Sequence, residues 1–145
     1  MIKSFFSQLE NDAIVQAIKE AEKNTSGEIR VHIENTCKSD VLDRAVAVFE
    51  LLGMHKTEAR NGVLFYLAVK DRKFAILGDV GINKVVPADF WDKIKENCIE
   101  NFKKGEFTKG LTEGIKAAGL QLKGHFPYQS NDVNELSDDI SFENN

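Results

Sequence analysis

Four side chains with oxygen ligands stand beside turn-forming residues of the sequence: Glu28, Asn61, Asp79 and Asp89. Carboxylate and amide oxygens are what a calcium ion collects, typically six to eight of them at about 2.3–2.6 Å. Glycines flank Asp79 in the stretch 78–81 and allow the backbone to turn its carbonyl groups inward. These residues are therefore candidate ligands of calcium or another hard divalent cation, with Asp79 and Asp89 as the leading pair.

A second polar group is the dipeptide Asp71-Arg72, which separates two apolar runs. Asn35, Thr36 and Asp40 follow the first predicted strand and would lie at the same end of the sheet. Open α/β sheets usually bind ligands at the carboxyl ends of their parallel strands. Asp71 and Arg72 are therefore candidates for an anion- or ligand-binding crevice.

Each of these residues also has a purely structural interpretation. Asp79 is a common type of turn residue, and Asp71-Arg72 suits a hairpin turn. Asp89, near a helix start, interacts favourably with the helix dipole without any metal ion. Glu28 suits a solvated charge at a strand edge. The residue types alone leave both interpretations open.

Signatures of better-known catalytic sites are absent from the sequence. Six residues separate Cys37 from Arg44, too many for a thiol-phosphatase loop, and none of them is a glycine that would let the amides converge on phosphate. Neither the phosphate-binding nor the dinucleotide-binding glycine motif occurs. The histidines lack a His or Cys partner at zinc spacing, and His32 is expected to be a solvated strand residue.

The hydrophobic pattern predicts the elements that position these residues. An apolar stripe predicts a helix that begins at the Ser-x-x-Glu capping box of Ser7 and ends near Lys23-Asn24. Alternation over 29–33 predicts a half-buried strand, and the wholly apolar run 63–69 predicts a central strand covered on both faces. Residues 41–52 between them have helical spacing, so strand, helix and strand form a βαβ unit with parallel strands.

The second half of the chain predicts a hairpin followed by two helices. Residues 74–77 should return antiparallel to the central strand, because the connection before them is too short for a crossover. Pro87 suits the first turn of the next helix. The last helix should run from about Glu106 to Lys123, and its three glycines indicate close packing against a neighbour. The fold class is therefore α/β, with a mixed, mostly parallel sheet.

This topology predicts where the candidate ligands meet. The starts of the two parallel strands and the end of the antiparallel strand lie at one end of the sheet. Glu28, Asn61 and Asp79 should therefore converge there, and Asp89 could join them from the first turn of the following helix. Asp71 and Arg72 belong to the opposite end.

The composition indicates one domain with a distinct tail. The 145 residues, 42% of them hydrophobic, suit a single core, which we assign to residues 1–124. Residues 125–145 contain five acidic residues and no Lys or Arg, so removing them changes the net charge from −4 to about +1. This tail is polar and aperiodic, and we expect it to be disordered or laid on the surface.

Charge and hydropathy also limit the partners. Neither the body nor the tail shows the clustered Lys and Arg of a nucleic-acid binder. The apolar runs are too short to cross a membrane, and no export signal is visible, so a cytoplasmic location is expected. Cys37 and Cys98 are expected to be reduced thiols.

A set of short motifs, in order along residues 5 to 123, resembles the TPM domain family. They are Thr25-Ser26-Gly27-Glu28-Ile29, Arg60-Asn61-Gly62-Val63-Leu64, Asp71-Arg72-Lys73, Gly78-Asp79-Val80-Gly81 and Gly105-Glu106-Phe107 with the glycines that follow it. The resemblance implies a Rossmann-like α/β/α sandwich. The family includes thylakoid-lumen proteins linked to photosystem II repair, and weak acid phosphatase activity and bound calcium are associated with some members.

Two functions follow as hypotheses. The first is a calcium-binding module that acts mainly through an unidentified protein partner, because oxygen ligands converge while no strong nucleophile or base is evident. The second is a metal-assisted acid phosphatase that hydrolyses phosphate monoesters, in which the ion polarises phosphate oxygens and activates water. Whether the protein is an enzyme at all stays open at this stage.

Overall fold

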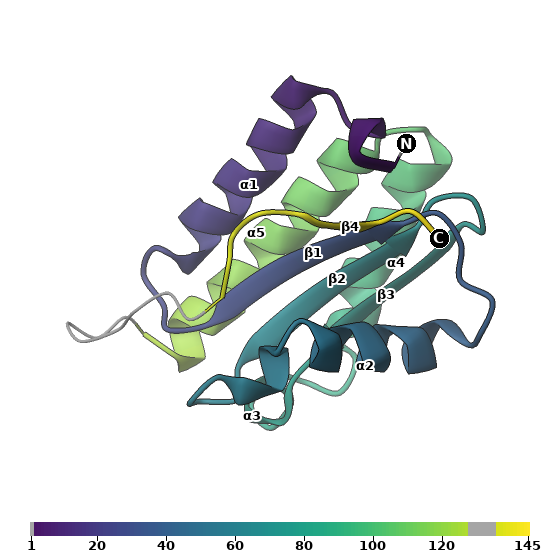
Figure 1. Ribbon diagram of the computed structural model, residues 1–145. Coiled ribbons are helices and arrows are strands. Elements are labelled where there is room, and N and C mark those ends of the chain that lie inside the picture. The colour runs from purple at the N-terminus through teal and green to yellow at the C-terminus, as the bar shows by residue number, and fades with distance from the viewer. Residues whose placement is uncertain (1, 128–135) are drawn as a thin grey trace.

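The computed structural model describes residues 2–127 and 136–145, which form a sheet between two layers of helices (Figure 1). The sheet has four strands in the order β3-β2-β1-β4. Their bounds are β1 (Glu28–Glu34), β2 (Gly62–Ala68), β3 (Lys73–Gly78) and β4 (Ser141–Glu143). The helices are α1 (Gln8–Glu22), α2 (Val41–Leu51), α3 (Val80–Asn83), α4 (Phe90–Lys103) and α5 (Phe107–His125), with short 3-10 turns at Ile2–Ser4 and Met54–Lys56.

The strand directions confirm the predicted α/β architecture. Strands β1 and β2 are parallel and are joined through α2, which is the expected βαβ unit. Strand β3 returns antiparallel to β2 after a short turn, as the hairpin prediction requires. Strand β4 adds to the free edge of β1, parallel to it. No pattern in the sequence indicates this fourth strand.

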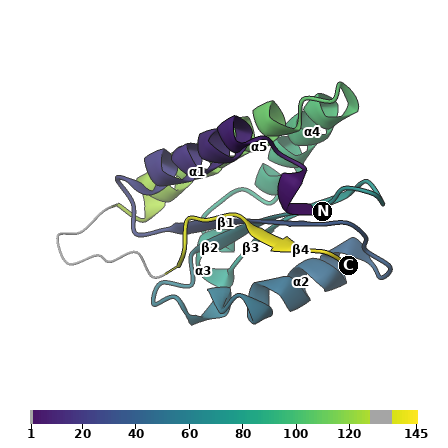
Figure 2. The same cartoon turned by 45° about the horizontal axis from the view of Figure 1, so that its top comes forward.

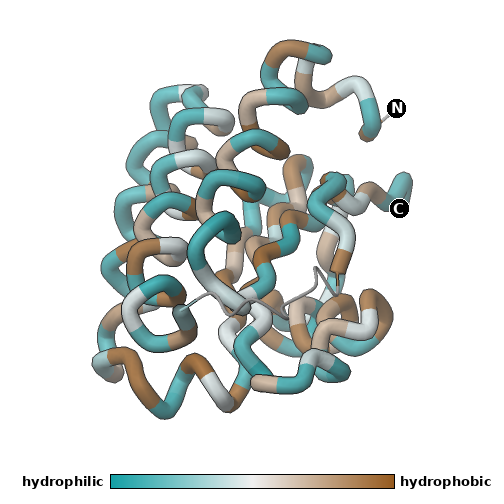
Figure 3. Tube along the Cα trace, turned by 90° about the vertical axis from the view of Figure 1, so that its left-hand side faces the viewer, coloured by the Kyte–Doolittle hydropathy of each residue, from teal (hydrophilic) through white to brown (hydrophobic). Residues whose placement is uncertain are grey.

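Helices α1, α4 and α5 cover one face of the sheet, and α2 covers the other (Figure 2). The side chains of Val31 and Phe65 belong to the core under the three-helix layer. Leu64 and Tyr66 instead pack with the α2 side chain Val48. Apolar and polar residues alternate along the helical traces in Figure 3, which is how each helix buries one side.

The capping box and the glycines of the last helix are confirmed. The Ser7 hydroxyl accepts a hydrogen bond from the Glu10 amide, and the Glu10 carboxylate accepts one from the Ser7 amide. A Cβ atom on Gly119 would lie 2.7 Å from the Ala21 Cβ, and one on Gly114 would lie 2.8 Å from the Cys98 Sγ. Helix α5 therefore packs on α1 and α4 at distances that only glycine permits.

Three sequence expectations are wrong in detail. Strand β1 is not half-buried, because Arg44 of α2 and Ser141 of β4 contact the side chains of its second face; only Arg30 is partly exposed. Residues 80–83, where the hydrophobic pattern predicts no element, form α3. Helix α4 begins at Phe90 with Asp89 as N-cap, so Pro87 precedes the helix instead of entering its first turn.

Both cysteines are free and buried. Among the described residues, no helix is long and apolar enough to cross a membrane.

Candidate functional site

The sheet brings Glu28, Asn61 and Asp79 to one end, as predicted. Glu28 is the register partner of Gly62, which directly follows Asn61. The Asp79 amide donates to the Gly62 carbonyl, 2.9 Å away, so Asp79 lies on the other side of the same strand start. The contacts of Asp89 are different. Its carboxylate is 59% exposed and pairs with Lys93 Nζ at 3.3 Å, one turn along α4.

Asp79 is held by Arg60. The guanidinium Nε and Nη2 donate to the two carboxylate oxygens of Asp79 at 2.8 and 2.9 Å. One of these oxygens also accepts from the Val80 amide at 2.7 Å, as the N-cap of α3. Arg60 lies in the turn before β2 and has φ of 51°, in the left-handed region. Asp79 can ligate a cation only if Arg60 moves away.

Asn61 has an unused oxygen in the interior. Its side chain is 1% exposed, and Nδ2 donates to the Ser26 hydroxyl at 3.3 Å. Oδ1 has no hydrogen-bond partner among the described residues. Glu28, at the same sheet end, is 2% exposed and is therefore not the solvated edge charge considered from sequence. A carboxylate and an amide oxygen are thus buried at the starts of adjacent strands.

Glu22, which the sequence analysis did not single out, adds a second carboxyl group beside Glu28. Its carboxyl accepts a hydrogen bond from the Ile29 amide at 2.6 Å. Burial above all, together with the hydrogen bond to Asp138 and the charge of Glu28, raises the pKa of Glu22 to about 10. Glu22 therefore holds a proton at neutral pH. Only the folded chain brings α1, β1 and residue 138 together, so no local pattern could have indicated this cluster.

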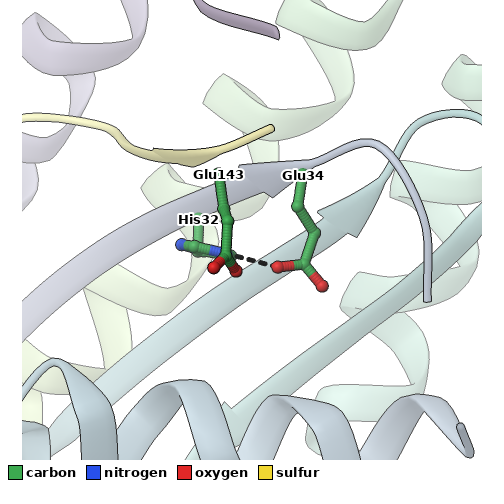
Figure 4. A group of neighbouring side chains, drawn as sticks. All are labelled: His32, Glu34 and Glu143. Atoms are coloured by element: carbon green, nitrogen blue, oxygen red, sulfur yellow. Dashed lines mark hydrogen bonds and ion pairs between the residues drawn. The ribbon is translucent and has the colours of Figure 1, made fainter. Parts of the chain in front are cut away.

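A second polar cluster lies between the sheet and α2 (Figure 4). His32 Nε2 is 2.9 Å from a Glu34 oxygen, and His32 Nδ1 is 2.9 Å from the Ser141 hydroxyl. Arg44 donates to both oxygens of Glu34 at 2.8 and 2.9 Å and also pairs with Glu143. The expectation of a solvated His32 is wrong, since the residue is 3% exposed.

The ionisation of this second cluster follows from its contacts. Burial lowers the pKa of His32, which is therefore neutral despite the adjacent carboxylate. Burial alone would raise the pKa of Glu34, but hydrogen bonds from Arg44, Tyr66 and His32 outweigh it and lower the pKa to about 2. Ligand atoms of His32, Glu34 and Glu143 lie within 4.8 Å of one another. Because Arg44 already pairs with both carboxylates, we interpret the cluster as a structural clamp and not as a metal site.

The predicted crevice at Asp71-Arg72 is tied to the loop after β1. An Asp71 oxygen accepts from the Cys37 amide at 2.7 Å, and Arg72 is exposed with φ of 52°. The amides of Asn35 and Thr36 both donate to the Asn145 side chain at 3.0 Å. The C-terminal residue of the chain therefore occupies part of this crevice.

The family model of the TPM domain matches residues 3–121. The chain belongs to the TPM domain family. It is similar to the BA42 protein of the psychrophilic bacterium Bizionia argentinensis, with 50% identity, 99% of each chain covered and a TM-score of 0.90. No curated protein matches it.

Two further structures share the TPM domain fold at low identity. The N-terminal domain of a P. gingivalis protein is 18% identical, with 86% of this chain and 82% of that one covered and a TM-score of 0.70. The N-terminal domain of cg2496 from Corynebacterium glutamicum is 13% identical, with 91% and 82% covered and a TM-score of 0.67. The family match ends before β4, whereas the similarity to BA42 includes the C-terminal residues.

Proposed function

We propose that this TPM domain binds a hard divalent cation, calcium in the first place, at Glu28, Asn61 and Asp79, and that it acts mainly through a protein partner. The observation that carries the proposal is the buried Asn61 Oδ1, which has no hydrogen-bond partner in the part of the chain that the structure describes. Leaving a buried polar atom unsatisfied costs about 1–3 kcal/mol. A calcium ion would use this oxygen together with the buried Glu28 carboxylate.

The charge around Glu28 supports the same proposal. Glu22 keeps a proton well above its normal pKa because it is buried and because it lies beside Asp138 and Glu28. A divalent cation would balance the negative charge of these carboxylates in place of that proton. Binding should therefore release a proton at neutral pH, as metal binding to protonated ligands generally does.

The other two predicted ligands, Asp79 and Asp89, already form ion pairs with basic side chains. Asp79 would join the ion when Arg60, whose side chain is 46% exposed, turns toward solvent. Asp89 is exposed and pairs with Lys93, so it contributes at most an outer ligand. Glu28 and Asn61 are accordingly the pair on which we base the test.

The second candidate function, a metal-assisted phosphatase for phosphate monoesters, is favoured by one observation. Arg60 places a partly exposed guanidinium beside the candidate cation ligands. Guanidinium groups bind phosphate oxygens in a bidentate manner, and a cation would polarise the same oxygens. This activity depends on the ion, so the cation test precedes any assay of phosphate-ester hydrolysis.

The cation test is thermal unfolding of chelator-treated protein with millimolar calcium, with magnesium, and without either. A ligand at a hundredfold excess over its Kd stabilises the folded state by about 2.7 kcal/mol. For a chain of this size we expect a rise in Tm of about 8 °C, at about 3 °C per kcal/mol. Glu28→Gln should abolish the rise, whereas Glu96→Gln, at an exposed position of α4, should keep it. Equal Tm values with and without calcium would refute the proposal.

A further inference from the structure

The C-terminal segment, residues 140–145, lies along the outer edge of β1 (Figures 1 and 2). Within it, β4 pairs with β1 over only three residues: His32 with Ser141, Ile33 with Phe142, and Glu34 with Glu143. A strand edge presents unpaired amides and carbonyls and is a template for another extended chain. The segment therefore satisfies an edge that the rest of the fold leaves open.

Specific side chains fix the segment in place. Phe142 packs against the core under the three-helix layer. On the opposite face, the Ser141 hydroxyl contacts His32 and the Glu143 carboxylate pairs with Arg44. Successive side chains of a strand point to opposite faces. The edge of β1 therefore suits a strand that has an apolar residue on one face and, one position later, a carboxylate on the other.

The end of the segment is bound to the loop after β1. Asn145 Oδ1 accepts hydrogen bonds from the amides of Asn35 and Thr36, and Asn145 Nδ2 donates to the Thr36 carbonyl at 2.8 Å. This loop follows the carboxyl end of β1, where open α/β sheets usually bind ligands. Asn144 Oδ1 accepts from the Ile2 amide at 2.8 Å.

The polar side chains at the edge of β1 have partners outside the C-terminal segment. Arg44 makes two hydrogen bonds to the buried Glu34, so it keeps its main partner when Glu143 leaves. His32 likewise keeps its contact with Glu34 when Ser141 leaves. The TPM family match also ends at residue 121, so the segment is an addition to the common body of the family.

We propose that the edge of β1 is a peptide-binding site, which the C-terminal segment occupies in cis and which binds an extended peptide of a partner protein when the segment is released. The partner peptide carries an aromatic residue followed directly by a carboxylate and adds parallel to β1, as in other cases of strand addition. A tethered occupant acts at an effective concentration on the order of millimolar, so it blocks weak peptides. This site is separate from the proposed cation site and needs no ion.

The test measures the fluorescence anisotropy of a labelled peptide of residues 136–145 with the 145-residue chain, in the presence of a chelator. A site that is occupied in cis about 99% of the time weakens binding of the free peptide about 100-fold. Phe142→Asp in the chain should release the segment and strengthen peptide binding at least about tenfold. Leu120→Asp, the same type of change at a 68% exposed position of α5, should leave binding as weak as in the unchanged chain.

Specificity is tested with variant peptides. A peptide with the Phe142→Asp change, or with Glu143→Arg, should not bind the released chain. Thermal unfolding first establishes that the Phe142→Asp chain is folded; if it is not, Glu143→Arg in the chain, which sets a positive charge against Arg44, serves as the releasing change. Peptide binding that is equally weak in a folded released chain, or that ignores both peptide substitutions, would overturn the proposal. Since a chelator is present throughout, this result is independent of calcium binding.

Discussion

Replacing Glu22 by Gln should stabilise the protein at neutral pH in the absence of metal ions. Glu22 is protonated in the folded protein, with a pKa of about 10, but ionised in the unfolded chain above its ordinary value of 4.5. The folded state therefore binds one more proton between these values, and its stability falls as pH rises through this window. Gln is isosteric with the protonated acid, so it can accept from the Ile29 amide and donate to Asp138 without this cost.

The size of this stabilisation follows from the difference between pH 7 and the pKa of Glu22 in the unfolded chain. The interval of 2.5 pH units from 4.5 corresponds to about 3.4 kcal/mol at 1.36 kcal/mol per unit. Because Glu22 is partly exposed, we reduce this to about 2 kcal/mol for solvent screening. At about 3 °C per kcal/mol, Glu22→Gln should raise the Tm by about 6 °C at pH 7.

The assay is the difference in Tm between Glu22→Gln and the unchanged chain, measured in chelator at pH 5, 7 and 9. Groups that titrate in both chains, His32 included, cancel in this difference, which should grow with pH. Glu20→Gln, at an exposed position of the same helix, is the matched control and should show no such growth. A difference that is independent of pH, or a lower Tm for Glu22→Gln at pH 9, would show that the carboxyl is not held protonated.

Two other perturbations test the interior. The pKa of Glu34 is lowered to about 2, so its carboxylate contributes about 3 kcal/mol to the free energy of unfolding above pH 4.5, and this contribution is lost as pH falls to 2. In acid unfolding, the free energy of unfolding should therefore fall over this pH range in the unchanged chain and fall less steeply in Glu34→Gln. A Gly114→Ala substitution should lower the free energy of unfolding in urea by about 1–3 kcal/mol, because its Cβ would lie 2.8 Å from the Cys98 Sγ and 2.9 Å from a Phe65 ring atom. Gly124→Ala, with open space around the added Cβ, should instead raise it by about 0.5–1 kcal/mol, and equal effects at the two glycines would refute the packing argument.

The parts of the fold that the sequence predicts are those with long, regular hydrophobic patterns. The capping box at Ser7, the apolar run of β2 and the short turn at Asp71-Arg72 each determine local structure, and together they fix the βαβ unit and the hairpin. The same topology correctly brings Glu28, Asn61 and Asp79 to one end. It does not predict that Arg60 neutralises Asp79, because the ion pair depends on a left-handed turn residue.

What the sequence does not predict is set by contacts between distant segments of the chain. Alternating polar residues in β1 indicate a solvated face, yet His32 and Glu34 are buried, because Arg44 from α2 and Ser141 from β4 satisfy them. Strand β4 itself is three polar or aromatic residues in an acidic tail, too short for any periodic signal. Its position is encoded by its fit to the edge of β1: an aromatic residue for the core and a carboxylate for Arg44. An extended peptide of another protein can present the same aromatic residue and carboxylate to this edge. This is why the C-terminal segment marks a binding site as well as completing the sheet.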